Sequence, residues 1–265
     1  MSPSFLKSNQ LYERALKTIP QGSQTYSKSA ENFVLGSFPL FIDSGKGGRV
    51  TDVDGNEFID FILALCPIIL GYRDQDIDIA IKDQLDKGII FSLASPLEAV
   101  LSEKLTALIP CAEKVRFAKN GSDVTAGAVR LARAHTGRDK VAICGYHGWH
   151  DWFIGTTAKG LGVPHAVKEL SHTFAWNQPD TLRALLEKHP DGFAAIILEP
   201  SGPEPPTIDF LREVRELADK FKAVLIFDEV VTGFRMHIGG AQSEYGIIPD
   251  LACFGKSMAN GMPLS

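Results

Sequence analysis

An aspartate and a lysine each follow a short apolar run in this chain. Asp228 ends a run that begins at Ala223, and Lys256 follows a run that begins at Pro249. Each run is typical of a buried strand, so each strand brings one charged group to its end. A lysine amine forms a Schiff base with an aldehyde, and a carboxylate keeps a pyridine nitrogen protonated. The two groups therefore suit pyridoxal phosphate, whose ring acts as an electron sink. The alternative is a strand-end aspartate and a surface lysine that never meet.

A polar turn, Asn120 to Asp123, lies where a phosphate could bind. It stands between a predicted strand that ends near Phe117 and a predicted helix. The backbone N–H groups of the turn and the Ser122 hydroxyl could hold a phosphate at the positive end of the helix dipole. The alternative is an ordinary loop in which Ser122 or Asp123 caps the helix.

An aromatic segment follows the predicted strand that ends at Cys144. Tyr146 or His147 could supply the face on which a flat cofactor ring lies, unless the segment simply packs on the domain surface. His147 and His150 are spaced as two metal ligands could be, but no third ligand stands nearby, so we expect no metal site.

Two further residues stand at strand ends. Glu199 follows the apolar run from Phe193 to Leu198, where its carboxylate could reach the surroundings of the cofactor, steer a substrate amine or cap a helix. Val230 comes two residues after Asp228 and could press on one face of the ring, although most valines are core residues.

The segments that would position these groups alternate between strands and helices from Gly71 onward. Strands are predicted at residues 115–118, 141–144 and 193–198, and a capping box that starts at Ser95 predicts a helix. Strands that are apolar throughout predict a mostly parallel sheet with helices on both faces, and ligands bind beyond the carboxyl ends of such strands.

The first 70 residues differ from the rest. A helix is predicted from Asn9 to Thr18, and three short strands follow within residues 39–62. The Asp54–Gly55 pair between the last two strands is a strong hairpin signal. We therefore expect a small antiparallel lobe over residues 1–70 and a large cofactor-binding domain over residues 71–265.

Composition excludes several classes of partner. The 265 residues are 45% hydrophobic and carry a net charge of −5, which argues against bulk affinity for nucleic acid or a membrane surface. Four widely spaced cysteines without a C-x-x-C motif fit a reducing compartment. With no signal-peptide pattern at the N-terminus and no long apolar run, we expect a cytoplasmic protein.

At this point the chain resembles the class III aminotransferases, which are fold type I pyridoxal phosphate enzymes, and within them the glutamate-1-semialdehyde 2,1-aminomutase branch. The resemblance covers nearly the whole chain and is most specific at residues 50–56, 228–235, 239–242 and 249–263. It implies pyridoxal phosphate as cofactor, small amine and oxo substrates, and a homodimer for a full-length protein.

The resemblance also implies roles for individual residues. Lys256 would carry the Schiff base and move the substrate proton, while Asp228 would pair with the pyridine nitrogen. Gly121 and Ser122 would bind the phosphate, Tyr146 would stack on the ring, and Val230 would pack on its opposite face. His147 and Glu199 are further candidates for contact with the cofactor.

The chain departs from the family pattern at several positions. Lys28 stands where the aminomutase has an arginine for the substrate carboxylate, and Val231 stands where many members have a glutamine. Because lysine binds a carboxylate only as a point charge, we expect an aminotransferase with a different substrate, with the aminomutase as the alternative. A racemase or decarboxylase would use the same lysine and aspartate.

The family continues beyond the position of Ser265 into a further strand and a C-terminal lobe. We therefore expect this lobe to be missing, so that the chain is either a fragment of a longer enzyme or a truncated, non-catalytic remnant.

Overall fold

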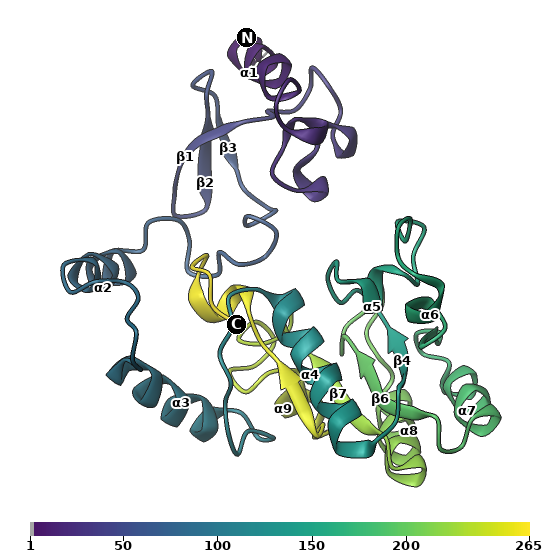
Figure 1. Cartoon of the computed structure of the whole chain (residues 1–265). Coiled ribbons are helices and arrows are strands. Elements are labelled where there is room, and N and C mark those ends of the chain that lie inside the picture. Colours follow the sequence, from purple (N-terminus) through teal and green to yellow (C-terminus); the bar gives the residue numbers. More distant parts are fainter. Residues whose placement is uncertain (1–2) are drawn as a thin grey trace. The chain divides into compact units, whose positions relative to one another are not determined.

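The computed structural model describes residues 3–265, and the chain separates into two compact units, Met1–Ile90 and Phe91–Ser265 (Figure 1). The helix α2 (Gln75–Leu85) falls in the first of them. The domain boundary expected between residues 70 and 71 stays a prediction. Within residues 3–265, no helix is both long and apolar enough to span a bilayer.

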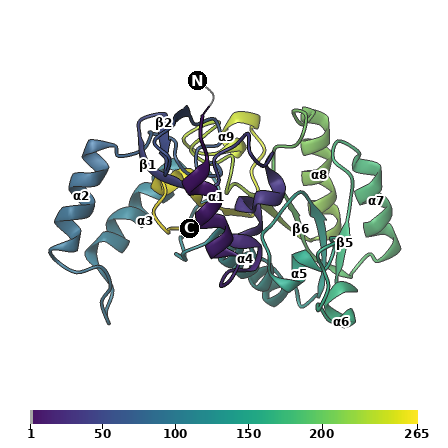
Figure 2. The same ribbon diagram turned by 90° about the horizontal axis from the view of Figure 1, so that it is seen from above.

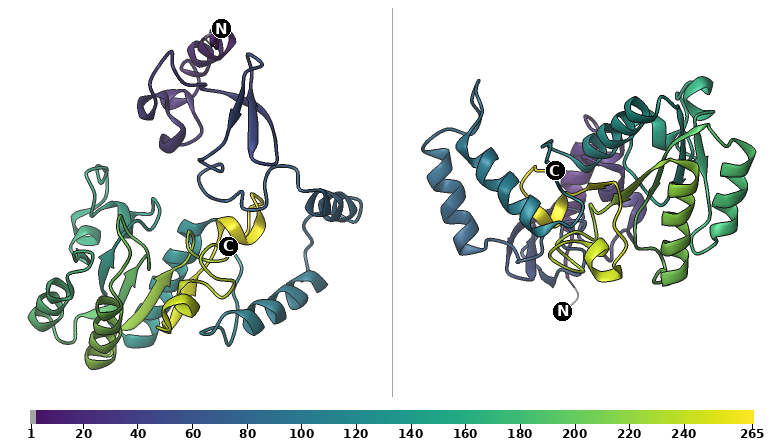
Figure 3. Two further views of the ribbon diagram at one scale, coloured as in Figure 1. Left: turned by 180° about the vertical axis from the view of Figure 1, so that it is seen from behind. Right: turned by 90° about the horizontal axis from the view of Figure 1, so that it is seen from below.

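The first unit contains a small antiparallel sheet, as expected. Its strands are β1 (Ile42–Lys46), β2 (Arg49–Asp52) and β3 (Glu57–Ile59), in the order β1-β2-β3 (Figure 3, left). Asp54 and Gly55 lie in the turn between β2 and β3, where Gly55 has a φ of +90° that suits glycine. The Asp52 carboxylate accepts the Asp54 and Asn56 N–H groups and closes this turn.

The first helix begins earlier than its sequence pattern indicates. Helix α1 spans Leu6–Ala15, and three short 3-10 helices follow it, η1 (Pro20–Gly22), η2 (Tyr26–Lys28) and η3 (Ala30–Asn32). The Asp54 carboxylate accepts the N–H groups of Lys7 and Ser8 at 2.8 and 2.9 Å. This carboxylate satisfies donors that a helix start leaves open, and its distance along the chain hides it from local pattern reading.

A five-stranded parallel sheet forms the centre of the second unit and confirms the predicted architecture. The strands are β4 (Lys140–Cys144), β5 (Ser171–Thr173), β6 (Phe193–Leu198), β7 (Val224–Asp228) and β8 (Leu251–Cys253), in the order β5-β4-β6-β7-β8. Every residue of β6 is buried, which explains its uninterrupted apolar run.

Helices cover both faces of this sheet. Ile196 and Leu198 pack with α7 (Pro179–Lys188) and α8 (Ile208–Phe221), which lie side by side in Figure 2. Ala195 and Ile197 point the other way and pack with α4 (Gly121–Thr136) and α5 (Asp151–Ile154). The alternation follows the pleat of a strand.

The remaining elements of the second unit are α3 (Pro96–Leu108), α6 (His165–Lys168), α9 (Ala241–Tyr245) and η4 (Lys256–Ala259). Helix α3 begins with the capping box predicted from Ser95 and Glu98. The strand predicted at residues 115–118 is wrong. Among the described residues, Ala118 exchanges backbone hydrogen bonds with Ser265 at 2.7 and 2.8 Å, and no ladder extends from this pair.

Candidate active site

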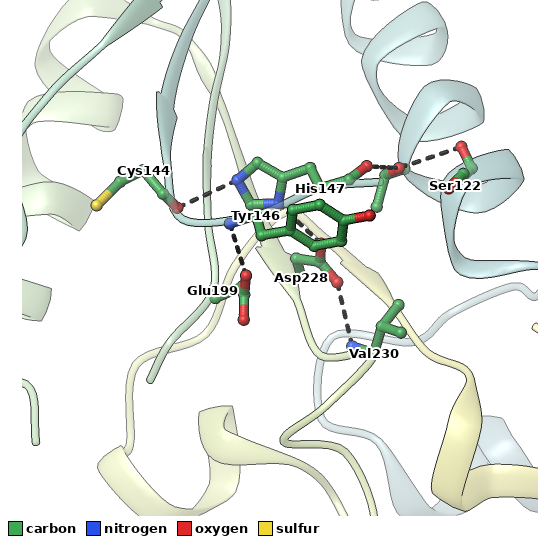
Figure 4. A network of polar contacts seen from close by, with 8 residues as sticks. Ser122, Cys144, Tyr146, His147, Glu199, Asp228 and Val230 are labelled. Carbon is green, nitrogen blue, oxygen red and sulfur yellow. Dashed lines mark hydrogen bonds and ion pairs between the residues drawn. The ribbon is translucent and has the colours of Figure 1, made fainter. Parts of the chain in front are cut away.

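Asp228 lies buried at the carboxyl end of β7, with 3% of its surface exposed. Its Oδ2 is 2.8 Å from Nδ1 of His147, and its Oδ1 accepts the N–H of Val230 at 3.1 Å (Figure 4). The other histidine nitrogen, Nε2, is 3.1 Å from the carbonyl oxygen of Cys144. A carbonyl can only accept, so Nε2 must carry a hydrogen. The short contact between Nδ1 and Oδ2 then needs a second proton, which His147 and Asp228 share.

His147 itself offers no open ring face. It is 1% exposed, Trp152 stacks on it with ring centres 6.1 Å apart, and Phe153 meets it edge-on at 5.4 Å. This burial corrects the expectation that His147 could supply a face for a flat cofactor. His147 instead binds the carboxylate of Asp228 and shares a proton with it.

Tyr146 presents the open aromatic surface instead. The residue is 62% exposed, and its ring rests edge-on against Phe153 at 5.4 Å. Its backbone N–H donates to Glu199 Oε1 at 2.6 Å, which joins the loop after β4 to the end of β6 (Figure 4). Burial and the nearby carboxylates of Glu199 and Asp228 raise the pKa of the Tyr146 phenol.

Glu199 experiences the charges of both sequence-predicted partners. Burial is the largest influence and raises the pKa of its carboxyl, and the charge of Asp228 raises it further. The Tyr146 N–H, His147 and the charge of Lys256 act in the opposite direction. Asp228 pairs with Cys253 across the β7–β8 ladder, so Lys256 follows three residues beyond the position on β8 that lies beside Asp228.

Lys256 opens the 3-10 helix η4, directly after β8 and Gly255. Its φ is +43°, in the left-handed region that side chains other than glycine rarely occupy. Such a backbone persists only where its surroundings hold it, and these conformations are frequent at functional sites.

Helix α4 begins with Gly121 and Ser122, the two residues that are expected to bind the phosphate. Among the described residues no side chain caps the helix at Asn120, so no side chain takes up the N–H groups of its first turn at the positive end of the dipole. A Cβ on Gly148 would overlap the Ser122 hydroxyl, and a Cβ on Gly121 would lie 3.0 Å from Val230 Cγ1. Gly121 and Gly148 therefore allow the start of α4, Val230 and the aromatic loop to approach one another closely. The residues present therefore fit pyridoxal phosphate: an anion-binding helix end, an open aromatic ring and a buried carboxylate.

Lys28 belongs to the first unit, whereas the residues above belong to the second. It sits exposed in η2 of the first unit, where its Nζ donates to Gln24 Oε1 at 3.3 Å. Its contact with a substrate stays a prediction. His150 lies 3.7 Å from Asp123, and in the part of the chain that the structure describes no three His, Cys, Asp or Glu side chains gather as metal ligands would.

Glu229 is a structural residue that sequence reasoning missed. Its carboxylate is fully buried and accepts hydrogen bonds from the Thr232 hydroxyl (2.5 Å), Ala241 N–H (2.7 Å) and Gln242 N–H (3.1 Å). Gly240 has a φ of +84°, and a Cβ there would lie 2.5 Å from Glu229 Oε1. The pair of glycines before α9 was the available signal, because it marks a close approach of backbone to a bulky group.

Comparisons with known proteins agree on one family. The model of the family Aminotransferase class-III matches residues 33–265. The chain is 46% identical to a 3-aminobutyryl-CoA aminotransferase of Cloacimonas acidaminovorans, over 98% of this chain and 63% of that protein. It is 38% identical to a glutamate-1-semialdehyde 2,1-aminomutase of Desulforamulus reducens, over 100% of this chain and 64% of that protein.

Among solved structures, a transaminase with pyridoxal phosphate bound superimposes with a TM-score of 0.91 at 32% identity, over 98% of this chain and 63% of that one. The chain thus spans a little under two thirds of the length of the relatives that it matches.

Proposed function

The chain belongs to the class III aminotransferase family, and on this premise we propose that it transfers an amino group between small amine and oxo substrates with pyridoxal phosphate as cofactor. The observation that carries the proposal is the buried Asp228–His147 pair at the end of β7, with Lys256 three residues beyond the β8 position that pairs with Asp228.

Each residue of the site would have one task. Gly121 and Ser122 would hold the phosphate, while Tyr146 and Val230 would flank the ring. When bound, the cofactor supplies an electron sink for charge that develops on the substrate carbon.

The acid and the lysine would handle the protons. Asp228 would hold the proton of the ring nitrogen, and His147 would fix that carboxylate from behind. Lys256 would anchor the cofactor and move a proton to and from the carbon that bears the amino group.

The relatives suggest two substrates for the first tests. The 46% identity to the 3-aminobutyryl-CoA aminotransferase supports an amino group on an acyl thioester, and Lys28 would then meet a carboxylate or phosphate of the substrate. The 38% identity to the aminomutase supports glutamate-1-semialdehyde as the second candidate.

We further propose a cytoplasmic homodimer. Within residues 3–265, which include all four cysteines, no disulfide is formed, which suits a reducing compartment. Leu93, Leu97 and Val100 are between 48% and 85% exposed on or next to α3, a stripe that a second copy could cover. Light scattering coupled to size exclusion measures the oligomeric state.

The function is tested by adding pyridoxal phosphate and following its visible absorption. Borohydride reduction and peptide mapping then show which lysine it modifies. We expect modification at Lys256, loss of the signal in Lys256→Ala, and an unchanged signal in Lys104→Ala, which removes an exposed lysine of α3. Cofactor bound equally by Lys256→Ala would contradict the proposal. Product analysis with 3-aminobutyryl-CoA and glutamate-1-semialdehyde separates the two substrates.

A further inference from the structure

The chain segments that follow β7 and β8 are packed against each other. Phe234 meets Phe254 edge-on, with ring centres 5.8 Å apart and planes at 64°. A Cβ on Gly233 would overlap the ring of Phe254, so this glycine allows the two segments their close approach. One segment begins at Asp228 and the other leads into Lys256. Their packing therefore sets where the acid and the lysine stand.

A polar bridge lies beside this apolar contact. The guanidinium of Arg235 donates through Nε to the Val231 carbonyl at 3.3 Å and through Nη2 to the Ser257 hydroxyl at 3.0 Å. Ser257 is 6% exposed and comes directly after Lys256. Arginine can make both contacts at once because its planar fork holds several donors in fixed directions.

The backbone of Lys256 needs such support. Its φ of +43° lies in the left-handed region, which is unfavourable for residues other than glycine, so neighbours must hold it. Within η4, the Met258 N–H donates to the Gly255 carbonyl at 3.0 Å, and the Arg235–Ser257 contact ties this turn to the end of β7.

We propose that Arg235 is a positioning residue that fixes Lys256 relative to Asp228 by binding Ser257 and Val231 at once. The proposal rests on the proposed function, because it assigns Arg235 a role only if Lys256 is the attachment point. Arg235 itself touches neither substrate nor cofactor in this role; it acts through the turn that carries the lysine.

The test measures how much pyridoxal phosphate is needed to modify half of Lys256, by borohydride trapping and peptide mapping. Labelling is performed at a temperature where each variant retains the circular dichroism of the wild type. Arg235→Gln removes the bridge, Ser257→Ala removes one of its ends without a change of charge, and Arg235→Lys keeps the cation without the fork. Arg212→Gln, which removes an exposed arginine of α8, is the matched control.

We expect the half-saturating concentration to rise about tenfold in Arg235→Gln and in Ser257→Ala, to rise less in Arg235→Lys, and to stay unchanged in Arg212→Gln. The double variant Arg235→Gln/Ser257→Ala should resemble Arg235→Gln alone, since both changes break the same contact. If Arg235 only stabilised the fold, its replacement would lower the melting temperature, but the labelling curves would coincide with the curve of the wild type.

Labelling curves of Arg235→Gln and Ser257→Ala that coincide with the wild type would overturn the proposal, and so would fully additive effects in the double variant. Failure of the wild type to label at Lys256 at any concentration would instead contradict the proposed function. The two failures are thus distinguishable.

Discussion

Replacement of Glu229 by glutamine should destabilise the second unit by about 3 kcal/mol, because the buried carboxylate accepts from donors on both of its oxygens. Thr232 and Ala241 donate to Oε2, and the backbone and side chain of Gln242 donate to Oε1. The NH₂ group of a glutamine must face one of these pairs. In either orientation a buried backbone N–H, that of Ala241 or Gln242, loses its acceptor.

The magnitude follows from two contributions. A buried donor without a partner costs about 1–3 kcal/mol, and each remaining bond weakens by roughly 1 kcal/mol when its acceptor loses its charge. For a unit of this size, about 3 kcal/mol corresponds to a fall in melting temperature of roughly 6–12 °C. The fall is measured by thermal and urea unfolding followed by far-UV circular dichroism.

Thr232→Val is the matched control for this prediction. It removes one donor and leaves the carboxylate with Ala241 and Gln242, so it should cost only about 1 kcal/mol. If Glu229→Gln melts within about 2 °C of the wild type, or no lower than Thr232→Val, the carboxylate does not hold this loop and the reasoning is refuted.

Three further predictions concern Gly148, Glu199 and His172. Gly148→Ala places a Cβ on the Ser122 hydroxyl at a φ of +100° and should weaken binding of pyridoxal phosphate at least about tenfold in a spectroscopic titration. Gly127→Ala in α4, where a Cβ meets nothing within 4 Å, should bind normally. Burial raises the pKa of the Glu199 carboxyl in the folded protein above its ordinary 4.5. The stability that Glu199 contributes is therefore complete below about pH 4.5, and it is lost as the pH rises through the raised pKa of the folded protein. Glu199→Gln should therefore melt higher than the wild type near pH 8 and equally near pH 4.5, while transamination falls; a variant that melts lower at the alkaline pH contradicts this. Burial, with the charges of Lys140 and His189, lowers the pKa of His172 below 6.5, so its contribution is present above pH 6.5 and lost as the pH falls through the lowered value. Because its buried Nε2 has no partner, His172→Phe should reduce the loss of melting temperature between about pH 7.5 and about pH 5.5, and an unchanged loss would count against this role.

The positions of Tyr146, Glu199 and Asp228 could be predicted from sequence because all three follow apolar runs. Parallel strands end at one edge of a sheet, so residues at their ends converge although they are far apart in the chain. The same rule underlies the expectation that Asp228 and Lys256 stand at the ends of buried strands. The side chains that support these groups were not predictable in this way, because their partners come from other segments.

Particular errors show where local patterns fail. A pattern of apolar residues alone would place Val124, Ala128, Leu131 and Ala132 on the inner face of α4, whereas the buried residues are Thr125, Val129 and Ala132. Thr125 turns inward because its hydroxyl donates to the His147 carbonyl at 3.0 Å, and no hydrophobicity pattern reveals a polar residue with a buried partner. Likewise, the local sequence does not reveal that His147 is buried, because its partner Asp228 lies on another strand.

The placement of Ser265 has a consequence for the turn that carries Lys256. The residue is 7% exposed, its backbone is bonded to Ala118, and its hydroxyl lies 2.9 Å from where a Cβ on Gly255 would stand. Gly255 directly precedes Lys256. A bulkier side chain in place of Ser265 would press on Gly255 and could shift the turn that carries Lys256 without unfolding the protein.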